Sequence, residues 1–293
     1  MKLMIQIPCY NEEKTLPVTA ADLPRSISGI DEIEYLIIND GSSDDTVDVA
    51  RKCGIHHIVS FPQNKGLASA FMAGIDACLR LGADIIVNTD ADNQYCGQDI
   101  EKLVRPILEK KAEMVIGERP INEIESFSFL KKKLQRLGSY VVRKASNTDI
   151  PDAPSGFRAY SRDAAMRLNV VSHYTYTLET IIQAGNKNIA LTSVPIRTNQ
   201  ETRESRLFHS MFGYIKKSVV TIFRIFMMYR PLRFFAVLGA VIFGLGTILG
   251  IRFLVYYFMG QGQGHIQSLI LTAVLLMIGF QIGITGLLAD IIA

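Results

Sequence analysis

The residues most suited to chemistry are Asp90 and Asp92, which follow the apolar run at 85–89. Side chains alternate along an extended chain, so both carboxylates are predicted to point the same way at the end of a buried strand. Adjacent carboxylates repel each other unless a cation lies between them, and a hard divalent cation accepts oxygen ligands. Such a cation could hold a diphosphate. A solvated turn before the next helix would use the same residues, so the pair alone leaves both interpretations open.

The elements that must position these aspartates alternate between strands and helices. Short apolar runs predict strands at 3–7, 35–38, 57–60, 85–89, 114–116 and 189–196. Helices are predicted between them, for example at 47–53 and 67–81. This alternation predicts a mostly parallel sheet covered by helices on both faces. Ligands bind such sheets at the carboxyl ends of the strands, where the polar turns of this chain fall.

Several functions are excluded by what the sequence lacks. The first predicted strand is not followed by Gly-x-Gly-x-x-Gly, which argues against a dinucleotide-binding domain. The turn at 64–66 (NKG) lacks the preceding glycine and following Ser or Thr of a phosphate-binding P-loop, which argues against an ATPase. A formal net charge of +3 is too small to indicate nucleic-acid binding.

The C-terminal part of the chain has the composition of a membrane segment. Residues 234–258 carry Arg252 as their only charge, and residues 266–289 carry none. At about 1.5 Å per residue, each run is long enough to cross a hydrocarbon core of roughly 30 Å. Both runs are too long and apolar for a buried hairpin in a soluble domain. The sequence therefore predicts a transmembrane helical hairpin, with Arg252 near the far interface.

The predicted domains are a catalytic domain at 1–205, an amphipathic interface helix at 206–231 and the hairpin at 232–293. Residues 203–233 contain seven Lys or Arg and one Glu, whereas the turn at 259–265 contains none of these residues. This asymmetry predicts a multi-pass protein of the cell membrane or an ER-type membrane, with its catalytic domain facing the cytoplasm. Small residues such as Gly239, Gly246 and Gly250 leave a homo-oligomer possible.

Three segments carry basic residues that suit phosphate or a membrane surface. Residues 127–147 form a predicted helix with one basic and one apolar face, which suits either packing on the sheet or contact with anionic lipid. The loop at 155–158 (SGFR) ends in Arg158, which suits a phosphate contact or a structural ion pair. Arg203 and Arg206 could converge on one anion or flank the membrane.

Four motifs in a fixed order resemble those of family 2 glycosyltransferases. They are P-x-Y-N-E at 8–12, N-D-G-S at 39–42, N-K-G at 64–66 and D-A-D-N-Q at 90–94. The chain looks most like the subgroup of dolichol-phosphate mannose synthase and bacterial polyprenyl-phosphate glycosyltransferases. The resemblance implies the GT-A fold, an α/β domain with a mostly parallel sheet between helices, here followed by the interface helix and two transmembrane helices. Tyr95-Cys96 depart from the His-Pro that relatives often carry there.

The resemblance also implies which residues form the site. Residues implied to hold the nucleotide sugar are Pro8, Tyr10, Glu12, Ile38, Asp40, Asp90, Ala91 and Arg119. Residues implied to hold Mg²⁺ or Mn²⁺ on the diphosphate are Asp90, Asp92 and Gln94. Residues assigned to catalysis are Asp92, Arg203 and Arg206, and those assigned to the acceptor phosphate are Ser155, Arg158 and Arg136.

The function implied is inverting transfer of a hexosyl group from a UDP- or GDP-sugar to a polyprenyl phosphate, dolichyl or undecaprenyl, at the cytoplasmic face. A phosphate monoester is already an anionic nucleophile, so positioning and charge stabilisation matter more than a strong general base. Two alternatives are a family 2 enzyme acting on a sugar or glycolipid and a catalytically idle membrane scaffold. A processive synthase is disfavoured because the chain has no Gln-x-x-Arg-Trp and no Trp.

Overall fold

The fold is that of a computed structural model, which describes residues 1–120, 138–140, 142–143, 146, 148–170, 176–199, 220, 223, 227, 231–260 and 262–292. The chain divides into an N-terminal unit, residues 1–216, and a C-terminal unit, residues 217–293. The two expected amphipathic segments, 127–147 and 206–231, fall mostly outside the described residues.

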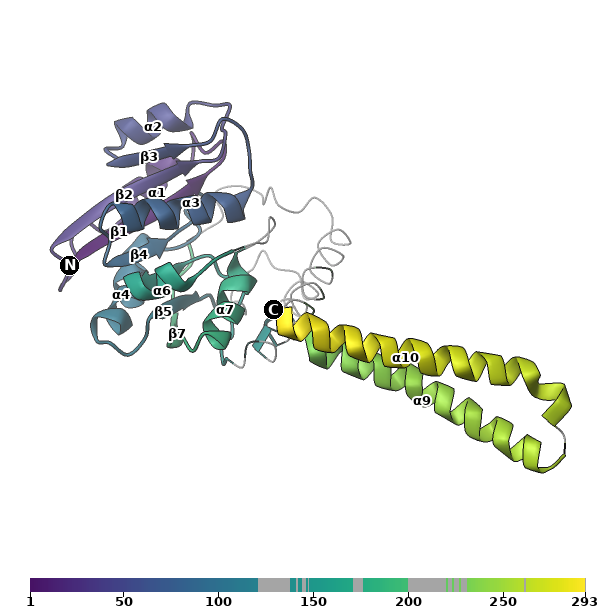
Figure 1. The fold of residues 1–293 in the computed structure, drawn as a ribbon. Helices are drawn as coiled ribbons and strands as arrows, with labels where there is room; N and C mark the ends of the chain where they lie inside the picture. Colours follow the sequence, from purple (N-terminus) through teal and green to yellow (C-terminus); the bar gives the residue numbers. More distant parts are fainter. Residues whose placement is uncertain are drawn as a thin grey trace. The chain divides into compact units, whose positions relative to one another are not determined.

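A single mixed sheet forms the centre of the N-terminal unit (Figure 1). Its strands in chain order are β1 (Lys2–Cys9), β2 (Glu32–Asn39), β3 (His57–Ser60), β4 (Ile85–Asn88), β5 (Met114–Glu118), β6 (Arg158–Ser161) and β7 (Leu191–Pro195). Their order across the sheet is β3-β2-β1-β4-β6-β5-β7. All neighbouring pairs are parallel except those that involve β6. The predicted mostly parallel sheet is confirmed.

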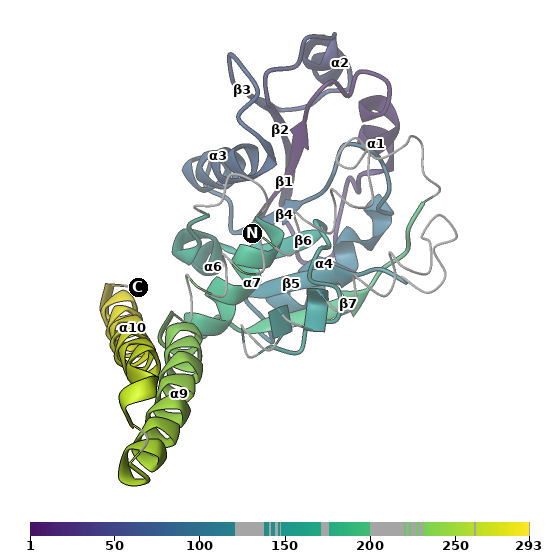
Figure 2. The ribbon, with the colours of Figure 1, turned by 90° about the vertical axis from the view of Figure 1, so that its right-hand side faces the viewer.

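Helices cover both faces of this sheet (Figure 2). They are α1 (Leu16–Asp22), α2 (Thr46–Lys52), α3 (Leu67–Arg80), η1 (Gly97–Asp99), α4 (Ile100–Leu108), α6 (Arg162–Arg167) and α7 (Thr177–Asn186). α1 and α4 lie on one face and α3 and α6 on the other. Leu3, Ile5 and Ile7 of β1 pack in the core under α1 and α4. Because parallel strands are buried on both faces, β1 is apolar almost throughout.

β6 was not predicted from the sequence, which reads 155–158 as a loop. The strand begins at Arg158 and runs antiparallel between β4 and β5, with Arg158 opposite both Asn88 and Ile116. Its four residues, Arg-Ala-Tyr-Ser, begin with an arginine that is fully buried. A charged residue at the start of such a short run hides the strand pattern, so β6 depends on pairing with strands distant in sequence.

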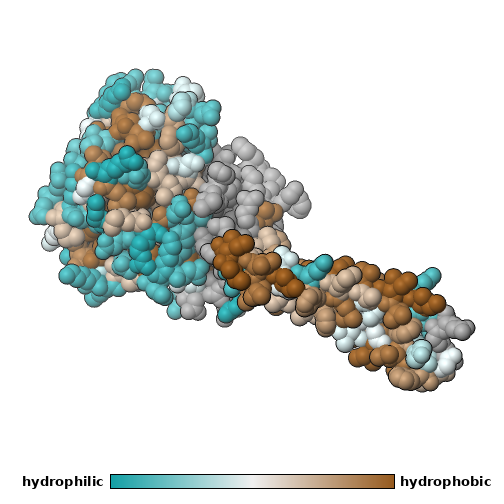
Figure 3. All heavy atoms as spheres, in the orientation of Figure 1, coloured by the Kyte–Doolittle hydropathy of each residue, from teal (hydrophilic) through white to brown (hydrophobic). Residues whose placement is uncertain are grey.

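The C-terminal unit is a hairpin of α9 (Pro231–Phe258) and α10 (Ile266–Ile292), joined through η2 (Gly262–His265). Both helices are long and apolar enough to cross a membrane, with mean hydropathies of 2.4 and 2.1. Only 11% and 17% of their most apolar windows are buried within the protein. Their outer surfaces are largely hydrophobic (Figure 3). Such exposure suits lipid and would be unfavourable for a soluble core.

Glycines allow α9 and α10 to approach each other closely. A Cβ added at Gly239 would lie 2.7 Å from the carbonyl oxygen of Gly279, and one added at Gly246 would lie 3.0 Å from Leu275 Cβ. A Cβ at Gly250 would meet Thr272 Cγ2 at 3.0 Å. These three α9 glycines therefore face α10 of the same chain, as small residues do at helix contacts in membranes. These contacts lie within one chain, so the possible homo-oligomer stays a prediction.

Candidate functional site

The carboxyl ends of β1, β2 and β4 meet at one edge of the sheet. Cys9 near the end of β1 lies opposite Asn39 of β2, and Gln6 of β1 lies opposite Asn88 of β4. The turns that follow these three strands therefore start at the same edge. These turns contain most of the residues that the sequence assigns to the nucleotide and the metal.

Asp90 occupies a crowded position in the turn after β4. Burial and the neighbouring negative charge of Asp92 together raise the pKa of Asp90 to about 7, although the positive charge of Arg119 opposes this shift. A Cβ added to Gly156 would come within 3.1 Å of Asp90 Oδ2, so the loop before β6 packs directly on this carboxylate. An anion that is desolvated and faces a second anion is stabilised by a cation.

A buried polar network supports the position of Asp90. Gln6 Nε2 donates to Asn88 Oδ1 at 2.9 Å. Asn88 Nδ2 then donates to the Gly156 carbonyl at 3.0 Å and to Tyr176 Oη at 2.8 Å. Tyr176 Oη donates to the same carbonyl at 3.2 Å. Because these bonds join β1, β4, the loop before β6 and the residue before α7, they fix Gly156 against Asp90.

Arg119 provides a fixed positive charge near Asp90. It follows β5, and its Nε and Nη2 donate to the two carboxylate oxygens of Asp152 at 2.7 and 2.9 Å. Asp152 is fully buried, and the Arg119 side chain is only 13% exposed. A two-pronged pair of this kind fixes the plane of the guanidinium. Arg119 therefore lies near the predicted site, with part of its hydrogen-bonding capacity already used by Asp152.

Tyr95 anchors the turn that carries the predicted metal ligands. Its ring is 6% exposed and stacks on Phe157 with centroids 4.9 Å apart. Its Oη accepts a hydrogen bond from Gly156 N at 3.1 Å. Burial raises the pKa of Tyr95, so its hydroxyl remains protonated. The departure from the family pattern at Tyr95-Cys96 thus places an aromatic residue in the core between this turn and β6.

Asp40 joins the end of β2 to the start of α3. Its two carboxylate oxygens accept hydrogen bonds from Lys65 N at 2.7 Å and Gly66 N at 3.0 Å. Gly41 has φ +70°, and a Cβ there would lie 2.4 Å from the backbone carbon of Gln63. The N-D-G and N-K-G motifs therefore form one structure, in which glycine is required at position 41.

The other predicted nucleotide-site residues differ in exposure. Tyr10 is 44% exposed, whereas Glu12 is 6% exposed and accepts a 2.6 Å hydrogen bond from Thr15 Oγ1. Pro8 is buried within β1. Ile38 and Ala91 are buried. A Cβ on Gly74 of α3 would lie 2.7 Å from Ile38 Cδ1, so the side chain of Ile38 belongs to the core.

The placement of Arg158 contradicts its assignment to the acceptor phosphate. The residue is fully buried. Its guanidinium donates to the carbonyls of Ala153, Ser155 and Thr177 and to Thr180 Oγ1, all at 2.7 to 2.8 Å. Ser155 is fully buried as well, and its role at the acceptor stays a prediction. Arg158 instead joins β6 to the preceding loop and to α7. Its role is structural, as in the alternative interpretation, but its partners are carbonyl and hydroxyl oxygens and not the carboxylate of an ion pair.

Three assigned arginines, Arg136, Arg203 and Arg206, lie outside the described residues. Their roles at the acceptor and the diphosphate stay predictions.

The predicted metal ligands offer oxygen atoms only. Within the described residues, no three His, Cys, Asp or Glu side chains gather into a metal site. Asp90 and Asp92 supply two carboxylates, and Asp92 Oδ1 accepts a 3.2 Å hydrogen bond from Gln94 N. Two carboxylates and an amide oxygen suit Mg²⁺ or Mn²⁺, which commonly complete their coordination with water and phosphate oxygens. The residues therefore fit a cation that binds together with a diphosphate.

Comparison with known proteins gives a consistent result. A family model described as "Glycosyl transferase family 2" matches residues 4–168. The chain is 30% identical to a UDP-N-acetylglucosamine–dolichyl-phosphate N-acetylglucosaminyltransferase of Methanococcus voltae, over 66% of this chain and 83% of that protein. It is 26% identical to an undecaprenyl-phosphate mannosyltransferase of Micrococcus luteus, over 73% of this chain and 90% of that protein.

The fold also matches a solved structure. Glucosyl-3-phosphoglycerate synthase from Mycobacterium tuberculosis, in complex with Mn²⁺, UDP-glucose and phosphoglyceric acid, superposes with a TM-score of 0.59. The match covers 77% of this chain and 79% of that one, at 18% identity. At this identity the likeness concerns the fold alone.

The raised pKa of Asp90 predicts a pH-dependent stability difference for Asp90→Asn. The pKa in the folded protein, about 7, lies above the usual 3.8, so protonated Asp90 favours the fold and this contribution is lost as pH rises between these values. In metal-free buffer, Asp90→Asn should gain stability relative to wild type between pH 5 and pH 8, by on the order of 2 kcal/mol after allowance for solvent screening.

Thermal unfolding of the full chain in detergent, followed by near-ultraviolet circular dichroism, measures this difference. Asp76→Asn is the matched control, because Asp76 forms an exposed pair with Arg80. A stability difference between Asp90→Asn and wild type that does not change with pH would contradict the prediction.

Gly156→Ala tests the close approach of the loop to Asp90. The new Cβ would lie 2.9 Å from Tyr176 Oη and 3.1 Å from Asp90 Oδ2, so one of these groups must move. We expect a loss of roughly 1–2 kcal/mol of unfolding free energy, as for other overpacked sites. Gly138→Ala is the control, because a Cβ at Gly138 meets nothing within 4 Å. Equal unfolding midpoints for both variants and wild type would show that the loop adapts without cost.

Proposed function

The chain belongs to glycosyl transferase family 2, and on this basis we propose that it transfers a hexosyl group from a nucleotide-diphosphate sugar to a polyprenyl phosphate. The observation that carries the proposal is the pair Asp90 and Asp92 at the carboxyl edge of the sheet, where the pKa of Asp90 is raised to about 7. An anionic site short of positive charge suits a metal-bound diphosphate. Relatives that act on dolichyl and undecaprenyl phosphates support the acceptor.

The donor is a UDP- or GDP-hexose in this proposal. The turns after β1 and β2, with Tyr10, Glu12 and Asp40, would bind the nucleoside, because they lie at the edge where Asp90 begins its own turn. The relatives' names include N-acetylglucosamine and mannose, so the family likeness leaves the sugar open. The solved glucosyl-3-phosphoglycerate synthase, which shares the fold, was crystallised with UDP-glucose.

The mechanism needs positioning rather than a strong base. A phosphate monoester oxygen would attack the anomeric carbon in line with the departing diphosphate, and this displacement inverts the anomeric centre. Mg²⁺ or Mn²⁺ held by Asp90, Asp92 and Gln94 would supply positive charge to the diphosphate. Arg119 adds a fixed cation near Asp90. Arg203 and Arg206 are proposed to neutralise the same leaving group.

The hairpin would hold the enzyme where its acceptor is found. α9 and α10 are long and apolar enough to span a membrane. The seven Lys or Arg at 203–233 would lie on the cytoplasmic side, together with the N-terminal unit. In this arrangement a polyprenyl phosphate could present its headgroup at the surface on which the catalytic unit operates.

The reaction is tested by nucleotide release from purified protein in detergent with Mn²⁺, scanning UDP- and GDP-sugars with and without a polyprenyl phosphate. We expect release that requires one donor and the lipid phosphate together, and a β-linked product from an α-linked donor.

Release with a sugar or glycolipid acceptor, and none with the lipid phosphate, would reassign the acceptor. Failure of every donor to bind would favour the idle scaffold instead.

Asp92→Asn should strongly weaken both metal binding and turnover. The carboxylate is replaced by a neutral amide of similar size, so the fold is retained while metal affinity falls. We expect activity to fall by at least about a hundredfold, the scale seen when one electrostatic contact to a transition state is removed. The increase in unfolding temperature caused by Mn²⁺ with nucleotide should also disappear.

Asp163→Asn, in the exposed first turn of α6, is the matched control and should behave as wild type. Wild-type activity in Asp92→Asn would overturn the metal assignment.

A further inference from the structure

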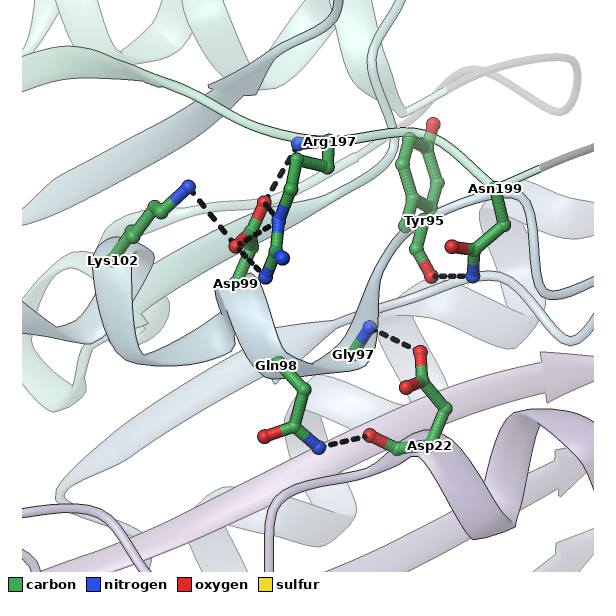
Figure 4. A network of polar contacts seen from close by, with 8 residues as sticks. All are labelled: Asp22, Tyr95, Gly97, Gln98, Asp99, Lys102, Arg197 and Asn199. Atoms are coloured by element: carbon green, nitrogen blue, oxygen red, sulfur yellow. Dashed lines mark hydrogen bonds and ion pairs between the residues drawn. The ribbon is translucent and has the colours of Figure 1, made fainter.

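The turn that carries the predicted metal ligands pairs with the chain just after β7 (Figure 4). Tyr95 and Thr198 form an isolated antiparallel bridge. Asn199 N donates to the Gln94 carbonyl at 2.9 Å, and Cys96 N donates to the Arg197 carbonyl at 3.4 Å. A short two-stranded ribbon therefore connects residues 94–96 to residues 197–199, about a hundred positions later in the sequence.

Asn199 contacts three consecutive carbonyls of this turn. Besides its backbone bond to Gln94, its side-chain Nδ2 donates to the carbonyls of Asn93 at 3.1 Å and Tyr95 at 3.3 Å. A side-chain amide has two N–H donors, and both are accounted for by these two bonds. One residue thus determines the path of the backbone through all three residues that follow Asp92.

The backbone of the turn is in the left-handed region between the two predicted ligands. Asn93 has φ +55°, a conformation that asparagine adopts more readily than other residues besides glycine. Asp92 and Gln94, on either side of it, are both predicted metal ligands, and Asp92 Oδ1 accepts a hydrogen bond from Gln94 N. A change of backbone conformation at Asn93 would therefore move these two ligands relative to each other.

The ribbon is itself anchored at the start of α4. Asp99 is 1% exposed and accepts hydrogen bonds from Arg197 N at 2.6 Å, Arg197 Nη2 at 2.7 Å and Arg197 Nε at 3.1 Å. Lys102 Nζ lies 3.0 Å from the same carboxylate. Hydrogen bonds from Arg197 keep the pKa of Asp99 below its usual value despite burial, so the anchor is charged at neutral pH.

We propose that Asn199 is a positioning residue for the metal site: it holds the 93–95 backbone so that Asp92 and Gln94 face the same cation. This inference rests on the proposed metal site, but it assigns a role to a residue that carries no ligand atom for the metal. Residues that orient metal ligands in this way typically change metal affinity by about 10- to 100-fold when they are replaced.

The test is Mn²⁺ binding by the full chain in detergent, measured by electron paramagnetic resonance with saturating UDP or GDP, whichever the wild type binds. Asn199→Ala removes both side-chain bonds, and Asn199→Asp replaces the amide donors with oxygens that repel the carbonyls of Asn93 and Tyr95. We expect the Kd for Mn²⁺ to rise about tenfold or more in both variants. In turnover assays the KM for Mn²⁺ should rise likewise, with kcat largely recovered at saturating Mn²⁺.

Thr198→Val is the matched control, because Thr198 pairs with Tyr95 through its backbone. Asn199→Ser, which retains one donor, should give an intermediate Kd. Unfolding temperatures measured in EDTA distinguish a misplaced turn from a misfolded unit. A positioning role predicts that the Asn199 variants unfold at nearly the wild-type temperature when no metal is bound.

The outcomes distinguish this proposal from the proposed function. Wild-type Mn²⁺ affinity in Asn199→Ala, with Asp92→Asn inactive, would overturn the positioning role and leave the metal site intact. A loss of Mn²⁺ affinity in Thr198→Val as large as that in Asn199→Ala would also overturn the positioning role. No Mn²⁺ binding by the wild type with either nucleotide would overturn the metal site and the positioning role together.

Discussion

The site depends on how the fold accommodates two like charges at the end of a buried strand. Asp90 and Asp92 follow β4 so closely that burial and their mutual repulsion raise the pKa of Asp90 to about 7. The fold does not neutralise this pair completely. Arg119 contributes a positive charge but is held by Asp152, and Gly156 leaves no room for another side chain beside the carboxylate. In the proposed function, a cation bound with a diphosphate would offset the remaining negative charge of this pair.

Two arginines, Arg158 fully buried and Arg119 mostly buried, show that the same side chain can have different roles in one unit. Arg119 is paired with a carboxylate and acts on Asp90 through its charge. Arg158 is surrounded by carbonyl oxygens and a hydroxyl, which use its hydrogen-bond donors within the interior. Both follow glycine-containing segments in the sequence, so local pattern does not distinguish them. The partners contributed by distant segments determine which arginine can influence a ligand.

Buried hydrogen bonds beside the site hold its loops in place. Gln6, Asn88 and Tyr176 form a chain of hydrogen bonds that ends on the carbonyl of Gly156. Asn199, which follows β7, donates hydrogen bonds to the turn after Asp92. Metal ligands bind effectively only when their orientation is fixed, and the groups that would fix the proposed ligands come from elements far apart in the sequence.

The sequence alone determined the family, the mostly parallel sheet and the two apolar helices, because these depend on local patterns: ordered motifs, short apolar runs and long uncharged ones. It also indicated that the turns after β1, β2 and β4 share one edge, since parallel strands end together. It could not reveal β6, the interior position of Arg158 or the contacts of Asn199. β6 and the contacts of Asn199 depend on pairing between residues far apart in the sequence, as between Asn88 and Arg158 or Asn93 and Asn199. The interior position of Arg158 depends on the loop before β6 and on α7, which fold around it. Only the folded chain brings such residues together, so only the tertiary structure could assign them.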